Sequence, residues 1–212
     1  MKRALSNRNV IAARFNTTPF TGPWLASIGR PDLRGTWIIY GGSGSGKTTF
    51  TLLLAKYLAT FRRVAYNSLE QGLSLSLQTA WRRVHMHEAG TNIILLNREQ
   101  MPELHERLAA KRAPSVIIID SLPYLDRFSW REYCALKNQF PDCLFIFITH
   151  EKRGMPDGAL ARRIRYDADV KIHVEGYKAF FTTRYENPEC GEGGADYVIW
   201  PEGARKYWAE IL

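Results

Sequence analysis

The segment from residue 37 to residue 49 constrains the fold of this chain more than any other. It reads Trp-Ile-Ile-Tyr-Gly-Gly-Ser-Gly-Ser-Gly-Lys-Thr-Thr, and the part from Gly41 to Thr48 fits the pattern Gly-x-x-x-x-Gly-Lys-[Ser/Thr]. An apolar run precedes the glycines and the apolar residues of a helical pattern follow them, which a flexible linker would not show. The segment therefore predicts a strand, a P-loop and a buried helix in direct succession.

Each residue type in this loop suits a phosphate group. Glycines let the backbone approach phosphate oxygens closely, and the N–H groups of the loop and of the following helix form an anion site. We expect Lys47 to reach the β- and γ-phosphates of a nucleotide, and the Thr48 hydroxyl to bind Mg²⁺. The predicted nucleotide-binding residues are Gly41, Gly42, Ser43, Gly44, Ser45, Gly46, Lys47, Thr48 and Thr49.

The composition is that of a globular, non-secreted protein. The 212 residues are 45% hydrophobic and 12% aromatic, which is enough for one sizeable core. No apolar run reaches the roughly 18 residues that span a bilayer, and residues 1–8 lead into no apolar signal segment. Cys134, Cys143 and Cys190 are odd in number and have no Cys-x-x-Cys spacing, which indicates a reducing, cytoplasmic location and argues against a zinc site.

The net charge of +8 is unevenly distributed along the chain. Residues 1–34 hold six basic residues against one acidic residue, and residues 151–166 hold five against two. These two segments account for the whole excess, which indicates a surface for a polyanion beyond the nucleotide, unless the charges serve only solubility. The basic residues of the second segment are Lys152, Arg153, Arg162, Arg163 and Arg165.

The order of apolar runs predicts an α/β fold with a mainly parallel central sheet flanked by helices. Continuous runs such as residues 116–119 are typical of strands buried on both faces, and their alternation with helical patterns indicates right-handed crossovers. We expect strands at residues 35–40, 63–68, 92–96, 116–120 and 143–149, and helices at residues 47–60, 71–84, 102–111 and 130–140.

The two ends of the chain differ from this pattern. Short apolar runs at residues 170–174, 179–183 and 197–200 predict a C-terminal antiparallel hairpin extension of the sheet. Residues 1–34 have no clean period, and we expect a basic lead-in with a short helix near residues 24–28. Its apolar residues would pack on the core: Phe15, Phe20, Trp24, Leu25 and Ile28.

Polar residues end three of the predicted strands at one edge of the sheet. Asp120 follows a buried strand, where ligands of open α/β sheets bind, and could support Mg²⁺ unless it only caps the next helix. Glu70 follows the second strand and could orient or deprotonate an attacking water, although an ordinary loop acid would look the same. His150 could contact the γ-phosphate, or be a solvent-exposed loop histidine.

Four motifs in this order resemble the ATPase core of the RecA superfamily, and most of all its RadA, KaiC and DnaB-like branch. They are Gly-Ser-Gly-Ser-Gly-Lys-Thr-Thr, Tyr-Asn-Ser-Leu-Glu, Ile-Ile-Ile-Asp-Ser-Leu and Phe-Ile-Thr-His-Glu-Lys. The resemblance implies a RecA-like ATPase domain over residues 35–212, with ATP and Mg²⁺ as cofactors.

The same resemblance assigns roles to individual residues. Glu70 matches the catalytic glutamate of the family and Asp120 its Walker B acid. Arg184 matches a basic residue that reaches the nucleotide of a neighbouring subunit as an arginine finger in oligomeric members. The segment 151–166 matches the position of a DNA-binding loop. The expected catalytic residues are therefore Glu70, Lys47, Arg184 and His150.

Three functions remain open at this point. We favour a cytoplasmic Mg²⁺-dependent ATPase that assembles as a ring or filament on single-stranded DNA in recombination, repair or replication. A KaiC-like ATPase that gates a protein partner is an alternative from another class. A P-loop kinase for a small molecule fits less well; there the arginines of residues 151–166 would close over the phosphates and Glu70 would touch the acceptor hydroxyl.

Overall fold

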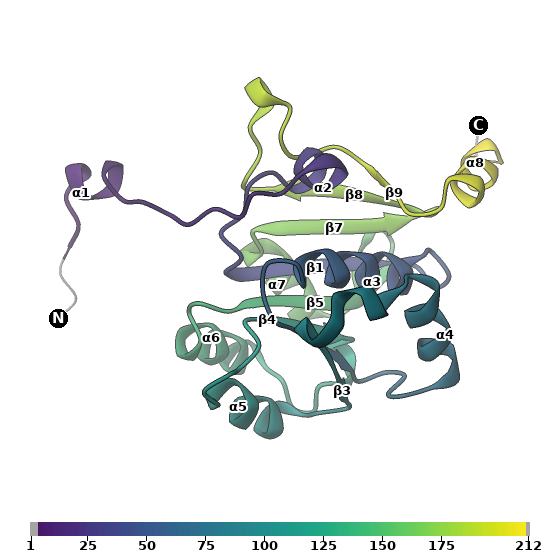
Figure 1. Ribbon diagram of the computed structural model, residues 1–212, viewed down its shortest axis with the longest axis horizontal. Helices are drawn as coiled ribbons and strands as arrows, with labels where there is room; N and C mark the ends of the chain where they lie inside the picture. The colour runs from purple at the N-terminus through teal and green to yellow at the C-terminus, as the bar shows by residue number, and fades with distance from the viewer. Residues whose placement is uncertain (1–3, 211–212) are drawn as a thin grey trace.

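The apolar runs form the middle of a mainly parallel sheet (Figure 1). Within residues 4–210, which are the residues that this computed structural model describes, the strands lie in the order β3-β2-β4-β5-β1-β7-β8-β9, and β6 pairs with the end of β5. The strands are β1 Gly35–Gly41, β2 Val64–Ser68, β3 Ile93–Asn97, β4 Val116–Asp120, β5 Leu144–Lys152, β6 Met155–Pro156, β7 Val170–Glu175, β8 Lys178–Thr183 and β9 Tyr197–Val198.

Pairing is parallel from β3 to β7 and antiparallel from β7 to β9. The predicted fold class is therefore confirmed, including the C-terminal hairpin extension. Strand β4 is buried throughout, as its uninterrupted apolar run indicates. The first three residues of the predicted basic lead-in lie outside the described residues.

Helices cover both faces of the sheet. α2, α3 and α4 pack on one face, where Phe50 and Leu54 of α3 are fully buried. α5, α6 and α7 pack on the other, through Leu104, Leu136 and Ile164. The α-helices are α1 Asn7–Ile11, α2 Gly22–Ile28, α3 Lys47–Leu58, α4 Leu75–Arg83, α5 Met101–Ala109, α6 Trp130–Gln139, α7 Ala159–Asp167 and α8 Pro201–Ala209, and the 3₁₀ helices are η1 Met86–Asn92, η2 Leu122–Tyr124 and η3 Pro188–Cys190.

The basic segment 151–166 is not the loop that was predicted. β5 continues to Lys152, forms a short hairpin with β6, and leads into the helix α7. α7 buries Ala161 and Ile164 on one side, while Arg162, Arg163 and Arg165 stand next to them in the sequence and hide this spacing.

Two further predictions were wrong in detail. α4 begins at Leu75, because the Ser74 side chain accepts a hydrogen bond from the Leu77 N–H at 3.2 Å and so caps the helix there. Leu73, which was expected inside this helix, is 69% exposed. The last strand ends at Val198, and Trp200 is instead the N-cap of α8, a helix that was not predicted.

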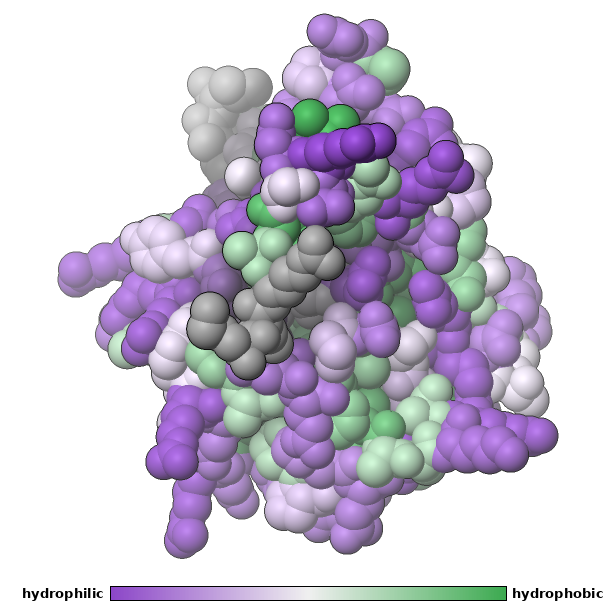
Figure 2. All heavy atoms as spheres, turned by 90° about the vertical axis from the view of Figure 1, so that its left-hand side faces the viewer, coloured by the Kyte–Doolittle hydropathy of each residue, from purple (hydrophilic) through white to green (hydrophobic). Residues whose placement is uncertain are grey.

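The N-terminal segment consists of a packed part and an exposed arm. Trp24 of α2 is 8% exposed and stacks on Tyr197 with ring centres 4.5 Å apart. Residues 4–17 are exposed, and Phe15 does not pack on the core as expected. α1 lies on this arm, away from the sheet (Figure 1). The side of the molecule that carries α1 is mainly hydrophilic, with small separate hydrophobic areas (Figure 2).

None of the helices within residues 4–210 has the length and apolar character needed to cross a membrane.

Replacing Trp24 by Ala is expected to lower the free energy of unfolding by about 3 kcal/mol, because the substitution leaves a cavity among buried aromatic rings. Urea unfolding followed by circular dichroism measures the change. Phe15→Ala on the exposed arm is the matched control and should change stability by no more than about 0.5 kcal/mol. Equal effects of the two substitutions would mean that α2 is not part of the cooperative core.

Candidate functional site

The P-loop turns tightly between β1 and α3. Gly46 is the N-cap of α3 with φ +100°, a left-handed conformation that glycine adopts without steric cost. Gly41 lies against β7, where an added Cβ would come within 2.1 Å of the Val174 carbonyl oxygen. Glycine is therefore required at both positions. The first N–H groups of α3 have no acceptor within the helix and are available to an anion.

The Lys47 ammonium folds back onto the loop. Its Nζ donates to the carbonyl oxygens of Gly41 at 2.8 Å and of Gly42 at 2.5 Å. An ammonium group has three protons, so one N–H remains for a ligand oxygen. Burial lowers the pKa of Lys47, and the negative charges of nearby carboxylates, Asp120 foremost, oppose this decrease. The loop thus fixes a cation beside its own N–H groups.

Asp120 ends β4 in the centre of the sheet and is 7% exposed. Its Oδ2 accepts a hydrogen bond from the hydroxyl of Tyr66, a fully buried residue of β2. Burial raises the pKa of the Asp120 carboxyl, and the hydrogen bond from Tyr66 opposes part of this increase. Burial also raises the pKa of Tyr66. A cation beside Asp120 would offset the unfavourable burial of the carboxylate.

Glu70 lies beside the end of β4. The Ser121 hydroxyl donates to Glu70 Oε2 at 3.1 Å, and His150 Nε2 lies 3.5 Å from the same oxygen. The backbone supports this position, because the N–H groups of Leu69 and Glu70 donate to the Asp120 carbonyl at 2.6 Å and 3.1 Å. The side chains of Glu70 and His150 are 33% and 41% exposed, so both reach the open side of the site.

These groups line one cavity of about 350 Å³, together with the P-loop. The structure therefore places Lys47, Thr48, Asp120, Glu70 and His150 around a single space, as the sequence predicted. Thr51 and Thr149 also line it, and their buried hydroxyl oxygens have no hydrogen-bond partner within residues 4–210. An unpaired buried hydroxyl costs roughly 1–3 kcal/mol, so a polar ligand in this cavity would stabilise the protein.

The oxygen groups of the cavity suit magnesium. The Thr48 hydroxyl and the Asp120 carboxylate belong to the same lining. Mg²⁺ prefers oxygen ligands and usually takes one or two from the protein, the others being waters and substrate phosphates. Among the described residues no cluster of three or more His, Cys, Asp or Glu could hold a metal without a substrate. The donor set therefore fits Mg²⁺ that arrives with a nucleotide.

A second, mainly apolar cavity of about 610 Å³ adjoins the cavity beside the P-loop, which we call the phosphate cavity. The Tyr177 N–H donates to the Ser45 carbonyl at 3.2 Å and so ties the turn between β7 and β8 to the P-loop. A flat ring system of a ligand suits such a cavity. The apolar residues that line it are Leu53, Val84, Ile199 and Trp200.

Arg184 is not brought to this cavity. β8 runs antiparallel to β7, so its end at Thr183 is level with Val170 at the start of β7. Arg184 Nη1 forms an ion pair with Asp169 Oδ1 at 3.1 Å, at the opposite edge of the sheet from the P-loop. Within one chain, Arg184 and the cavity therefore lie at opposite ends of the strands.

The basic residues of segment 151–166 fall into two groups. The Arg163 guanidinium lies 4.1 Å from the centre of the Trp130 ring. That of Arg165 lies 5.7 Å from the centre of the Tyr40 ring and donates to the Tyr40 hydroxyl at 3.3 Å. Both arginines are thus held by rings of their own chain. The other three basic residues are Lys152, Arg153 and Arg162, which are exposed, as Arg163 also is.

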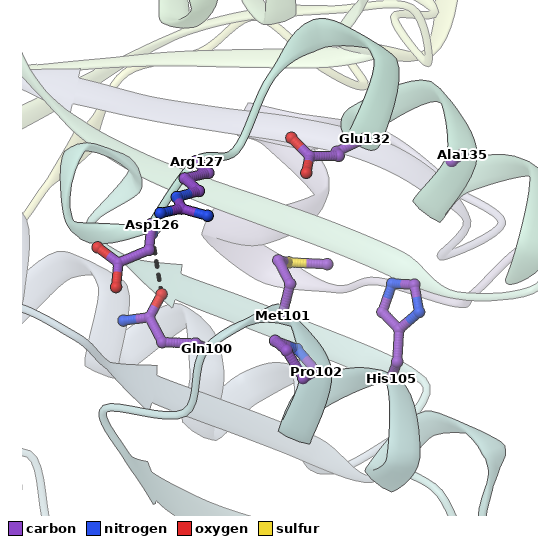
Figure 3. Close-up of a pocket in the computed structure, with 8 residues that line it drawn as sticks. All are labelled: Gln100, Met101, Pro102, His105, Asp126, Arg127, Glu132 and Ala135. Atoms are coloured by element: carbon purple, nitrogen blue, oxygen red, sulfur yellow. Dashed lines mark hydrogen bonds between the residues drawn. The ribbon is translucent and has the colours of Figure 1, made fainter.

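A larger hollow, of about 830 Å³, lies between α5 and α6. Figure 3 shows Met101 and His105 of α5 on one side of it and Glu132 of α6 on the other. Its lining differs throughout from that of the P-loop cavity. It also lies on the side of the sheet that α3 does not cover. The groups suited to phosphate chemistry therefore gather in the smaller cavity.

Several residues of the site were not predicted. Tyr66 and Ser121 lie inside the motifs Tyr-Asn-Ser-Leu-Glu and Ile-Ile-Ile-Asp-Ser-Leu, so their proximity to the site could have been expected from the strand ends. Arg83 and Tyr177 come from the end of α4 and from a hairpin turn. No pattern in the sequence links either of them to the P-loop.

No protein-family model and no curated protein matches this chain. Solved structures do match it. Flagellar accessory protein FlaH from Methanocaldococcus jannaschii is 16% identical, with a TM-score of 0.54 over 76% of this chain and 82% of that chain. KaiC-like protein PH0186 from Pyrococcus horikoshii OT3 is 15% identical, with a TM-score of 0.54 over 84% and 94%. A third structure, an ATPase domain, is 13% identical, with a TM-score of 0.53 over 81% and 83%.

Each of these likenesses covers at least 76% of this chain. The chain has the RecA-like P-loop fold. The predicted resemblance to RecA-superfamily ATPase cores is confirmed for the fold. At such low identity the RecA-like fold does not by itself define the reaction or the partner.

Replacing Asp120 by Asn is expected to stabilise the nucleotide-free protein at neutral pH. Because burial raises the pKa of Asp120, the unfolded chain releases this proton at a lower pH than the folded chain. The free energy of unfolding therefore falls as the pH rises from about 4 to the raised pKa of Asp120. Above that pKa, the loss of stability caused by the buried carboxylate is constant. Asn cannot ionise and avoids this penalty.

Urea unfolding at neutral pH and below about pH 4 tests this expectation, because the advantage of Asp120→Asn should disappear in acid. Asp126→Asn, at an exposed position, is the matched control and should change stability little at either pH. A less stable Asp120→Asn protein at neutral pH would contradict the argument.

Proposed function

We propose that this protein binds Mg·ATP and hydrolyses it, as an assembly of several copies on single-stranded DNA. The observation that carries the proposal is the convergence of Lys47, Thr48, Asp120 and Glu70 on one cavity of about 350 Å³. P-loop N–H groups, a lysine, a hydroxyl and a buried carboxylate together are what a nucleotide triphosphate with its metal requires.

The residues of the cavity divide the work of hydrolysis. Lys47 and the first N–H groups of α3 hold the phosphates, and Thr48 and Asp120 hold the metal. Bound Mg²⁺ would supply positive charge that offsets the negative charge of the phosphates. Glu70 accepts a proton from water as its oxygen attacks the γ-phosphorus, and the bond to the bridging oxygen of ADP breaks. Ser121 and His150 hold Glu70 in place.

The apolar cavity next to the P-loop supports a nucleotide over inorganic phosphate as the ligand. Its lining suits the adenine ring, and Tyr177 and Trp200 offer aromatic rings 5.0 Å apart in an edge-to-face arrangement. The structural neighbour that is itself an ATPase domain points in the same direction.

Single-stranded DNA is the proposed polyanion. Lys152, Arg153 and Arg162 are exposed and can contact phosphates. Tyr166 of α7 is 72% exposed and lies one helical turn after Arg162, where its ring can stack on an unpaired base. The kinase alternative has less support, because Arg163 and Arg165 are held over aromatic rings rather than presented to the phosphate cavity.

Assembly is proposed from two observations. Arg184 lies at the opposite edge of the sheet from its own cavity, so it could act as an arginine finger only in a neighbouring copy. The exposed arm carries apolar side chains that its own chain does not cover, and a second copy could bury them. They are Leu5, Val10, Ile11 and Phe15, each at least 59% exposed.

Replacing Glu70 by Gln is expected to leave ATP affinity near its original value and to lower turnover by about 100-fold or more, because the amide cannot accept the proton of water. Phosphate release gives the turnover, and fluorescence titration with a labelled ATP gives the affinity. Lys47→Ala is the blank, expected to lose turnover and most of the binding. Unchanged turnover in Glu70→Gln would remove Glu70 from the proposed role.

Single-stranded DNA is expected to raise the steady-state ATPase rate several-fold, and the stimulation should fall as salt rises, because phosphate contacts release counterions. Arg162→Ala should weaken the stimulation. Arg131→Ala removes an exposed arginine of α6 outside the basic segment and should retain it. Hydrolysis that is indifferent to DNA would instead favour an ATPase gated by a protein partner.

A further inference from the structure

The phosphate cavity and the apolar cavity meet along one boundary. Four residues line both cavities: Gly46, Thr49, Arg83 and Tyr177. A nucleotide with its β- and γ-phosphates in the first cavity and its base in the second must cross this boundary. The groups that cross are the ribose and the α-phosphate, because they join the base to the rest of the phosphate chain.

Arg83 is the charged residue at the boundary. It is the last residue of α4, it is exposed, and its side chain forms no ion pair with another residue in the range 4–210. A guanidinium group carries five N–H donors in a planar fork that matches two oxygens of a phosphate. Its position and its donors therefore suit a single phosphate group at the boundary.

The distribution of charged residues around the two cavities also indicates that Arg83 binds a phosphate. The charged side chains that line the phosphate cavity are the cations Lys47 and Arg83 and the anions Glu70 and Asp120. Lys47 is held by the carbonyl oxygens of the P-loop, on the side of the β- and γ-phosphates. Among the described residues, Arg83 is the one charged residue in the lining of the apolar cavity, so it supplies the positive charge where the base-bearing half of a nucleotide begins.

We propose that Arg83 binds the α-phosphate of the nucleotide held by its own chain. This inference rests on the proposed nucleotide-binding function and assigns a second cationic side chain, besides Lys47, to the nucleotide site. Arg83 acts within one chain, whereas the role proposed for Arg184 requires a neighbouring copy.

A different role for Arg83 would be structural. A cation in the last turn of a helix interacts favourably with the helix dipole, and Arg83 lies in the last turn of α4. Arg82 lies in the same turn, is also exposed, and lines neither cavity. Arg82→Ala is therefore the matched control, because it removes the same charge from the same helix end without changing the boundary.

The test is the affinity of the full chain for a series of ligands that lose one phosphate at a time. Competition against a fluorescent ATP analogue gives dissociation constants for ATP, ADP, AMP and adenosine. Arg83→Ala is expected to weaken the first three ligands by a similar factor of about tenfold, because each has an α-phosphate, and to leave adenosine unchanged. Arg83→Lys should recover part of the loss, and Arg82→Ala should bind all four like the original protein.

Several results would overturn the inference. A loss for ATP alone would place Arg83 at the γ-phosphate, and a loss for adenosine would place it at the base or ribose. Equal losses in Arg82→Ala and Arg83→Ala would assign the effect to the helix end. Thermal unfolding of each variant shows whether it is folded, and Arg83→Lys carries the comparison if Arg83→Ala is not.

The outcome also separates this inference from the function on which it rests. If the original protein binds ATP no better than Lys47→Ala does, the proposed nucleotide-binding function fails. If the original protein binds ATP and Arg83→Ala binds it equally well, only the assignment of Arg83 fails.

Discussion

The candidate site depends on the parallel register of four neighbouring strands. Ser68 pairs with Asp120, Asp120 pairs with Ile148, and Gly41 pairs with His150, so the ends of β2 and β4 are level and β1 ends two residues beyond them. β5 passes both levels and ends at Lys152. A shift of one residue in any of these strands would turn its side chains to the opposite face of the sheet. The apolar residues of β4 and β5 are buried and resist such a shift. The hydrophobic core therefore determines where the polar groups meet.

Two buried polar groups of the candidate site reduce the stability of the protein without a ligand. Asp120 is a buried carboxylate, and Thr149 has a buried hydroxyl without a hydrogen-bond partner within residues 4–210. A metal with its phosphates would provide what both groups need. Nucleotide binding at such a site would raise the free energy of unfolding, because the bound ligand also removes the unfavourable contributions of the buried carboxylate and the unpaired hydroxyl.

The sequence predicted those parts of the molecule that depend on local patterns. The P-loop, the buried strands and the positions of Asp120 at the end of β4 and of Glu70 just after β2 follow from motif and periodicity. The predicted strand end at His150 was wrong, because β5 continues to Lys152. Arg83 and Tyr177 could not be predicted, because they reach the cavities through the packing of α4 and of a hairpin turn. The helix α7 was missed because its arginines outnumber the buried positions Ala161 and Ile164. A single sequence carries little signal for residues that meet only through tertiary packing, and little for short helices with few buried residues.

The antiparallel course of β8 has a consequence for how copies of this chain could share their sites. Because β8 carries Arg184 to the edge opposite the P-loop, a copy that lends Arg184 to its neighbour must use the other edge to receive one. Such contacts are head-to-tail and give the assembly a direction. In an open filament the cavity at one end would always lack an arginine, whereas in a closed ring every cavity would have one. Ring closure alone would then change the turnover per subunit.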